Sequence, residues 1–247
     1  MRAVNYLVAA AGALITATSV MGAVVAQIEV IASDDSGVVG SHVWTTTVGA
    51  DGSYSWGPGS PGYSPVTFSN GSFVESVSFG WIHDPQVTSS FNVTSGITQT
   101  TFTINSALLS FDPIASPIGV ASAFIGVTNS SFGGNTGSIT LNGLHAGGAI
   151  FAARANGNVD TFANLIAGPG TVAVAPGLSV SYVGANPSSP GYDIVPFAAS
   201  DMQSQFKFSL SSFDSASGTS TYEIIPAPGA AALLGLGGLV ALRRRRS

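Results

Sequence analysis

The stretch SVSFGW, residues 76–81, decides the expected fold. Its large apolar residues Val77, Phe79 and Trp81 alternate with serine or glycine. Successive side chains of a β-strand point to opposite faces, so this alternation predicts a strand with one buried and one solvated face. We therefore expect Phe79 and Trp81 to belong to a hydrophobic core.

The same period of two recurs along the chain, and turn-forming clusters separate the runs. Alternating runs occur at FKFSL (206–210), SFNVT (90–94), TFTIN (101–105) and around Glu29, and turn signals occur at 49–53, 57–62, 69–72, 133–137 and 186–191. Many short strands with frequent turns predict an all-β fold, an antiparallel β-sandwich of Ig-like or jelly-roll type. The stretch 143–157 has the weakest strand character, because its alanines permit a short helix while its glycines oppose one.

Charge is scarce and unevenly placed. Of the 7 lysines and arginines, only Arg154 and Lys207 lie between the terminal segments, against all 12 acidic residues. A surface this negative repels phosphate backbones, so we expect no nucleic-acid partner. The chain has no cysteine, so its stability must come from a core, which 247 residues can supply.

The N-terminus has the pattern of a secretory signal. Arg2 precedes an apolar stretch that ends in small residues at Ala23 and Ala26. This order predicts a signal helix over residues 1–26 that is cleaved after one of the two alanines. An uncleaved membrane anchor is the alternative, and export follows from both.

The C-terminus, IIPAPGAAALLGLGGLVALRRRRS (224–247), predicts a transmembrane helix. Residues 230–242 give about 20 Å of helix, and counting from Ile224 gives about 28 Å, close to the ~30 Å hydrocarbon core of a bilayer. A cluster of four arginines follows and would stay on the cytoplasmic side, which stops translocation: Arg243, Arg244, Arg245 and Arg246. The alternative is a buried C-terminal helix of a soluble domain.

These residues carry a resemblance to a known family. The motif Pro226-Ala227-Pro228-Gly229, the Gly/Ala/Leu-rich stretch and the arginine cluster resemble the PEP-CTERM sorting signal of bacterial surface proteins. Ala227 stands where the family name has glutamate. The resemblance implies a partner, a membrane-embedded exosortase that acts as protease or transpeptidase near the motif.

The resemblance also implies a location and a division of the chain. The protein would reside briefly in the inner membrane and then in the cell envelope or the exopolysaccharide matrix. We expect a signal peptide at 1–26, an exported sandwich domain at 27–223 and a sorting segment at 224–247. The stretch from Asp84 to Leu108 is similar to one found in many such proteins, and it implies a β-sandwich of undefined molecular role.

Motifs for catalysis are weak. The glycines of GPGSPG (57–62) fit a dinucleotide-binding spacing, but the two prolines and the following strand pattern predict an ordinary loop. His42, His83 and His145 are scattered and lack zinc-site spacing. Since no nucleophile elbow or selected carboxylate pair occurs, we predict a non-enzymatic protein without a cofactor.

Carbohydrate is one candidate ligand. Trp56 and Tyr63 flank the 57–62 loop, and we expect them to form an exposed aromatic pair that stacks on sugar rings. A carbohydrate-binding or carbohydrate-active module is therefore the alternative to a sandwich of undefined role. A concave sheet face with exposed aromatic rings and two carboxylates favours this alternative, and a flat polar surface opposes it.

Calcium is the second candidate ligand. Asp34, Asp35 and Asp51 lie in predicted loops, and hard cations prefer carboxylate oxygens. Solvated turn aspartates give the same pattern, and the EF-hand spacing is missing. A calcium-dependent adhesin remains a third hypothesis.

Overall fold

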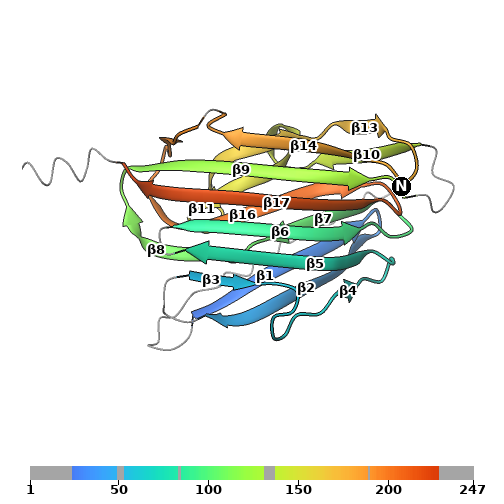
Figure 1. Ribbon diagram of the computed structural model, residues 1–247, viewed down its shortest axis with the longest axis horizontal. Coiled ribbons are helices and arrows are strands. Elements are labelled where there is room, and N and C mark those ends of the chain that lie inside the picture. Colours follow the sequence, from blue (N-terminus) through green and yellow to red (C-terminus); the bar gives the residue numbers. More distant parts are fainter. Residues whose placement is uncertain (1–23, 49–52, 83–84, 131–136, 189, 228–247) are drawn as a thin grey trace, which may run out of the picture.

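The computed structural model describes residues 24–48, 53–82, 85–130, 137–188 and 190–227. These residues form two antiparallel sheets of nine and eight strands that face each other (Figure 1). The predicted antiparallel β-sandwich is confirmed. The two sheets together hold more strands than the roughly seven to nine of an Ig-like domain or the eight of a jelly roll.

The nine-stranded sheet forms the rear layer in Figure 1. Six of its strands follow one another as neighbours: β12 (Asp160–Ala167), β11 (Ala149–Ala155), β16 (Ala199–Leu210), β7 (Thr100–Asn105), β1 (Val24–Asp34) and β2 (Gly37–Val48). Three more extend it beside β16 and each other: β8 (Leu109–Ile114), β10 (Ser138–Gly143) and β13 (Gly170–Ala173).

The eight-stranded sheet forms the front layer in Figure 1. Its six consecutive neighbours are β14 (Ser179–Asn186), β9 (Pro117–Thr128), β17 (Ser215–Pro226), β6 (Gln86–Thr94), β5 (Phe73–Ile82) and β3 (Ser53–Trp56). The short strands β4 (Val66–Thr67) and β15 (Asp193–Ile194) pair with β5 and β9.

The core fills the space between the sheets and is rich in aromatic rings. Phe79 and Trp81 are buried on the inner face of β5, as their alternation predicted. Phe91 of β6 meets Phe206 and Phe208 of β16 across the core, with ring centroids 4.9 and 5.7 Å apart. Such edge and stacked contacts stabilise a core beyond the area that they bury. They hold the eight-stranded sheet in a fixed position on the other one.

One prediction failed inside the sandwich. The short helix permitted within 143–157 is a 3-10 turn at Ala146–Gly148 followed by strand β11. Every residue of β11 except Arg154 is buried. Because both faces of this strand are covered, its sequence shows no alternation. Small alanines fit where both faces pack closely.

The sandwich also begins earlier than the expected residue 27. Strand β1 starts at Val24, which lies opposite Val48 of β2. Cleavage after Ala26 would remove three paired strand residues, whereas cleavage after Ala23 would leave β1 whole.

At its other end the sandwich extends past the expected residue 223. Ile224 is buried in the core, Pro226 lies opposite Pro117, and the Ala227 N–H donates to the Ser116 carbonyl at 3.1 Å. A membrane helix therefore cannot be counted from Ile224, as the 28 Å length assumed. These residues belong to the sheet instead, because their backbone pairs with β9.

The remaining terminal predictions lie outside the described residues. They are residues 1–23 of the signal helix that was predicted over 1–26, and the sorting helix with Pro228, Gly229 and Arg243–Arg246. Within the part of the chain that the structure describes, no helix is long and apolar enough to cross a membrane.

Candidate functional site

The predicted aromatic pair is adjacent but not exposed. The Trp56 and Tyr63 rings lie 5.5 Å apart, yet Trp56 is only 2% exposed and its Nε1 donates to the Pro61 carbonyl at 3.2 Å. Trp56 lies opposite Phe79 in the β3–β5 pairing and packs against its ring. Tyr63 is half-buried and stacks on Trp44. The pair is therefore part of the core and its edge, and cannot offer two free ring faces to a sugar.

The predicted calcium ligands form a turn where the structure describes them. Asp34 ends β1, and its Oδ1 accepts the Ser36 N–H at 2.8 Å and the Ser36 hydroxyl at 2.5 Å. Its Oδ2 accepts the Thr98 hydroxyl at 3.0 Å. The Ser36 bonds, more than the Thr98 bond, lower the pKa of Asp34. Asp35 occupies the exposed turn and Asp51 lies outside the described residues. No group of three metal-ligating side chains occurs in the described part of the chain.

The histidines do not converge where they are described. His42 lies on β2 against the Trp44 ring, and His83 is outside the described residues. His145 precedes the 3-10 turn, is 8% exposed and has a ring nitrogen 3.3 Å from the Gln205 carbonyl. Burial first, and then the Arg154 charge, lowers the pKa of His145 to about 4. His145 is therefore neutral at physiological pH.

The outer face of the eight-stranded sheet is rich in serine and threonine, and we call it the hydroxyl face. It presents the outward side chains of β9, β17, β6 and β5, which alternate with core residues: Ser122, Phe124, Ser217, Thr219, Thr221, Glu223, Gln86, Thr88, Ser90, Asn92, Ser76 and Ser78. Some hydroxyls bond across strands, as those of Ser78 and Ser90 do at 2.6 Å. Serine and threonine are thus the commonest outward residues, and the same strands also turn Ile118, Val120, Ile82 and Ile225 outward.

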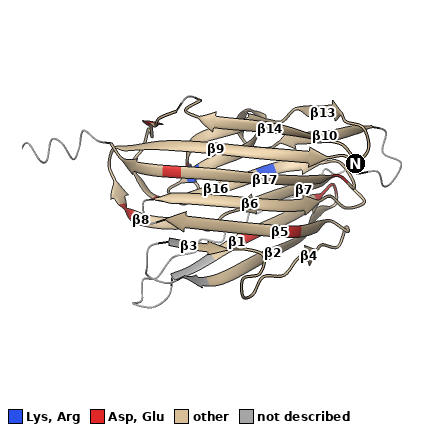
Figure 2. Cartoon of the chain, in the orientation of Figure 1, with Lys and Arg blue, Asp and Glu red and all other residues tan. Residues whose placement is uncertain are grey.

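This face carries very little charge. Figure 2 shows acidic residues on β17 and β5, which are Glu223 and Glu75. The two cations among the described residues, Arg154 and Lys207, belong to β11 and β16 of the other sheet. The hydroxyl face is therefore weakly negative and otherwise neutral.

Two shallow depressions, of about 460 and 510 Å³, lie on the hydroxyl face. The first is lined from β14, β9 and β17, and the second from β3, β5 and β6. One row of small residues in register joins them, and we call this row the trough: Ala185, Ser122, Thr221, Thr88, Gly80 and Ser55. Strands lie about 4.8 Å apart, so a row over six strands is about 24 Å long.

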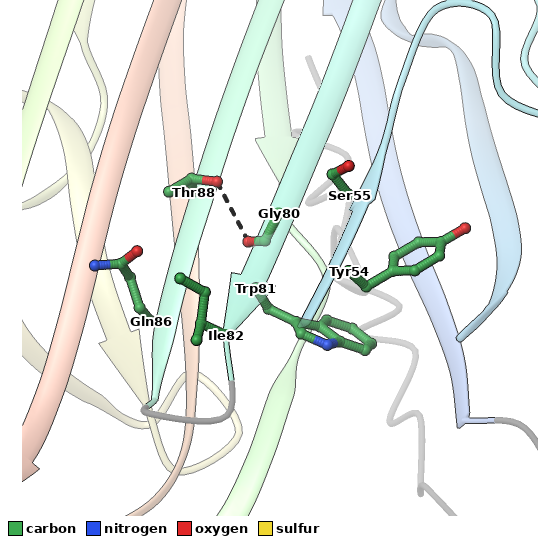
Figure 3. A pocket seen from close by; sticks show the side chains of 7 residues that line it. All are labelled: Tyr54, Ser55, Gly80, Trp81, Ile82, Gln86 and Thr88. Atoms are coloured by element: carbon green, nitrogen blue, oxygen red, sulfur yellow. Dashed lines mark hydrogen bonds between the residues drawn. The ribbon is translucent and has the colours of Figure 1, made fainter. Parts of the chain in front are cut away.

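Gly80 keeps one end of the trough open (Figure 3). The Thr88 hydroxyl is turned toward it and donates to its carbonyl at 3.4 Å. A Cβ at position 80 would lie 2.8 Å from that hydroxyl oxygen. Ile82 and Gln86 stand beside this end. The absence of a side chain at Gly80 therefore creates the depression.

Larger side chains flank the other end of the trough. On one side stand Phe124, 36% exposed, and the more exposed Val183, which is its register partner. On the other side Glu223 accepts the Tyr192 hydroxyl at 2.7 Å and the Gln86 amide at 3.1 Å. These bonds hold Tyr192, which is 43% exposed, at the rim. The site thus combines a hydroxyl floor with two aromatic side chains.

The sequence contains only part of the signal for this site. Alternation predicted that Ser76, Ser78 and Gly80 point outward. The neighbours of these residues on β6, β17 and β9 depend on strand register, which no local pattern specifies.

Comparisons with known proteins give no family. No protein-family model matches the chain, and no curated protein matches it. Among solved structures, a carbohydrate-binding module of the β-sandwich superfamily matches at 8% identity and a TM-score of 0.19, over 81% of this chain and 72% of that one.

Two viral proteins match at a similar level. The structure of the infectious bursal disease virus Gx strain has 8% identity and a TM-score of 0.21, over 93% of this chain and 71% of that one. The VP2 subviral particle of infectious bursal disease virus has 9% identity and a TM-score of 0.17, over 91% and 74%. TM-scores this low give no basis for a function.

Proposed function

We propose that the protein is an exported, non-enzymatic β-sandwich protein of the cell envelope or extracellular matrix. A signal peptide at the N-terminus would direct export. The segment after Ala227 would hold the chain in the inner membrane until an exosortase-type enzyme processes it. The observation that carries this proposal is the ordered series of Pro226–Gly229, the apolar stretch and the four arginines.

Two structural features support the proposal. Strand β17 leads into Pro226 and Ala227, so the sorting motif begins at the surface of the sandwich without a linker. On the hydroxyl face, both carboxylate oxygens of Glu223 are engaged by neutral partners, Tyr192 and Gln86. This arrangement fits a surface that displays polar groups to the solvent better than it fits a catalytic centre.

Carbohydrate binding is the second candidate function, and the trough favours it. The hydroxyl floor can exchange hydrogen bonds with sugar hydroxyls, and the partly exposed rings of Phe124 and Tyr192 can stack on sugar rings. This candidate uses another part of the molecule than the Trp56–Tyr63 pair expected from the sequence.

Cell fractionation and mass spectrometry of both termini test the first proposal. We expect a mature N-terminus near Ala23 or Ala26 and a mature C-terminus near the Pro226–Gly229 motif. Replacing all four arginines Arg243–Arg246 with serine should release or misroute the protein, because nothing would then stop translocation. The matched replacement with lysine keeps the charge and should behave as the wild type. Unchanged membrane retention of the serine variant, or a full-length cytoplasmic product, would contradict the proposal.

A further inference from the structure

We propose that the trough binds a single chain of an uncharged polysaccharide, lying across the strands of the eight-stranded sheet. This inference rests on carbohydrate binding, the second candidate function. It adds the class of glycan, the direction of the chain and the residues that contact it.

The shape of the trough fits an extended polymer. Its row runs from the edge strand β14 to the edge strand β3, and Thr221 of one depression is the register partner of Thr88 of the other. The row is about 24 Å long, which accommodates several consecutive sugar rings. Both depressions are open to solvent, and each supplies three of the six residues of the row.

The chemistry of the floor fits sugar hydroxyls. Ser122, Thr221 and Thr88 each present a hydroxyl that can donate one hydrogen bond and accept others, and the Gln86 amide can do both. Sugar hydroxyls have the same dual character, so either partner can supply the proton. Mixed donor and acceptor groups in a row suit a ligand that repeats the same hydroxyl pattern.

The walls fit the apolar faces of sugar rings. Phe124 and Glu223 lie on either side of the row, because Phe124 pairs with Thr219, four residues before Glu223 on β17. Four residues of strand span about 13 Å. Tyr192 is held at the Glu223 side by its hydroxyl. A sugar chain in this space has the Phe124 ring on one side and, on the other, Glu223 with the Tyr192 hydroxyl bonded to it.

Charge selects against acidic polysaccharides. Glu223 is the one charged side chain at the edge of the described trough, and the cations Arg154 and Lys207 belong to the other sheet. A uronate-rich polymer would bring further negative charge to Glu223 without a compensating cation. Repulsion over this short range persists at physiological ionic strength. A neutral glycan meets no such penalty.

Affinity electrophoresis and isothermal titration calorimetry of the purified full-length chain test this inference. The neutral probes are hydroxyethyl cellulose, dextran and galactomannan, and the anionic probe is alginate. We expect at least one neutral probe to bind, and alginate to bind at least tenfold more weakly. The double variant Phe124→Ala/Thr221→Val should weaken neutral-glycan binding at least tenfold, because it removes a wall and a floor hydroxyl.

Two further variants separate binding from folding. Thr88→Gln places a longer side chain in the trough at a solvent-facing position and should also weaken binding. Thr45→Val removes an exposed hydroxyl from β2, on the other sheet, and should leave binding within twofold of the wild type. Thermal melting of each variant verifies that it is folded.

Three results would overturn the inference: no binding of any neutral probe, unchanged binding by both trough variants, or tighter binding of alginate. None of these results bears on export, which the fractionation of the arginine variants tests separately. The trough and the sorting segment can therefore fail independently.

Discussion

Replacing Tyr222 with phenylalanine should make the protein more stable. Tyr222 is 0% exposed on the inner face of β17, and its hydroxyl has no hydrogen-bond partner among the residues that the structure describes. Burial, and then the Asp201 charge, raises its pKa, so the hydroxyl stays neutral. An unpaired buried hydroxyl costs about 1–3 kcal/mol, whereas the ring and its stacking on Phe162 survive the change. We expect the free energy of unfolding to rise by about 1–2 kcal/mol.

The same substitution at Tyr54 is the matched control. The Tyr54 hydroxyl is 2.7 Å from the Thr46 hydroxyl oxygen, so Tyr54→Phe breaks a hydrogen bond and should cost about 0.5–1.5 kcal/mol. Urea denaturation measures both effects as shifts of the midpoint at constant slope. Thermal midpoints should move by about 2–4 °C per kcal/mol in opposite directions. A loss of stability in Tyr222→Phe equal to that in Tyr54→Phe would show that the Tyr222 hydroxyl is paired, and would refute the reasoning.

Three further predictions test the core, a close backbone contact and a buried base. Phe79→Ala should cost about 3–5 kcal/mol in urea denaturation because it leaves a cavity, while Ser76→Ala on the outward face should stay within about 0.5 kcal/mol. Gly143→Ala should greatly reduce the yield of folded protein, since its Cβ would lie 2.1 Å from a backbone oxygen; Gly126→Ala, whose Cβ meets nothing closer than 3.5 Å, should fold normally. The lowered pKa of His145 means that the unfolded chain takes up its proton first as the pH falls from about 6.5 to 4. The fold should lose about 2 kcal/mol over this interval, allowing for residual solvent access, and His145→Gln should remove that part of the loss in denaturation at pH 7 and pH 4.

Local alternation was sufficient to predict the strands that have one solvated face. The runs at 76–81, 90–94, 101–105 and 206–210 lie in β5, β6, β7 and β16. Strand β11 was missed because almost all of its residues are buried, so its sequence lacks the alternation of apolar and polar residues that marks a half-exposed strand. Its neighbours β12 and β16 cover its two edges, and only the tertiary structure identifies it as a strand.

The candidate site was less predictable than the fold, for two different reasons. Trp56 was expected at the surface because it borders a Pro/Gly-rich loop, but Tyr54 and Trp56 share one face of β3 and lie opposite Trp81 and Phe79. The loop composition masked that short alternation. The trough requires the register of six strands, and Ser122, Thr221 and Thr88 become neighbours only through long-range pairing.

Strand β17 links the two proposals physically. It supplies Thr221 to the floor of the trough and Glu223 to its edge, and it ends at Pro226, where the proposed sorting motif begins. It pairs with β9 over its whole length and with β6 from Ser215 to Glu223, so both of its edges are hydrogen-bonded. A force between a bound polymer and the C-terminal segment would run along this strand and load two ladders in shear. An edge strand would have only one ladder to resist the same force.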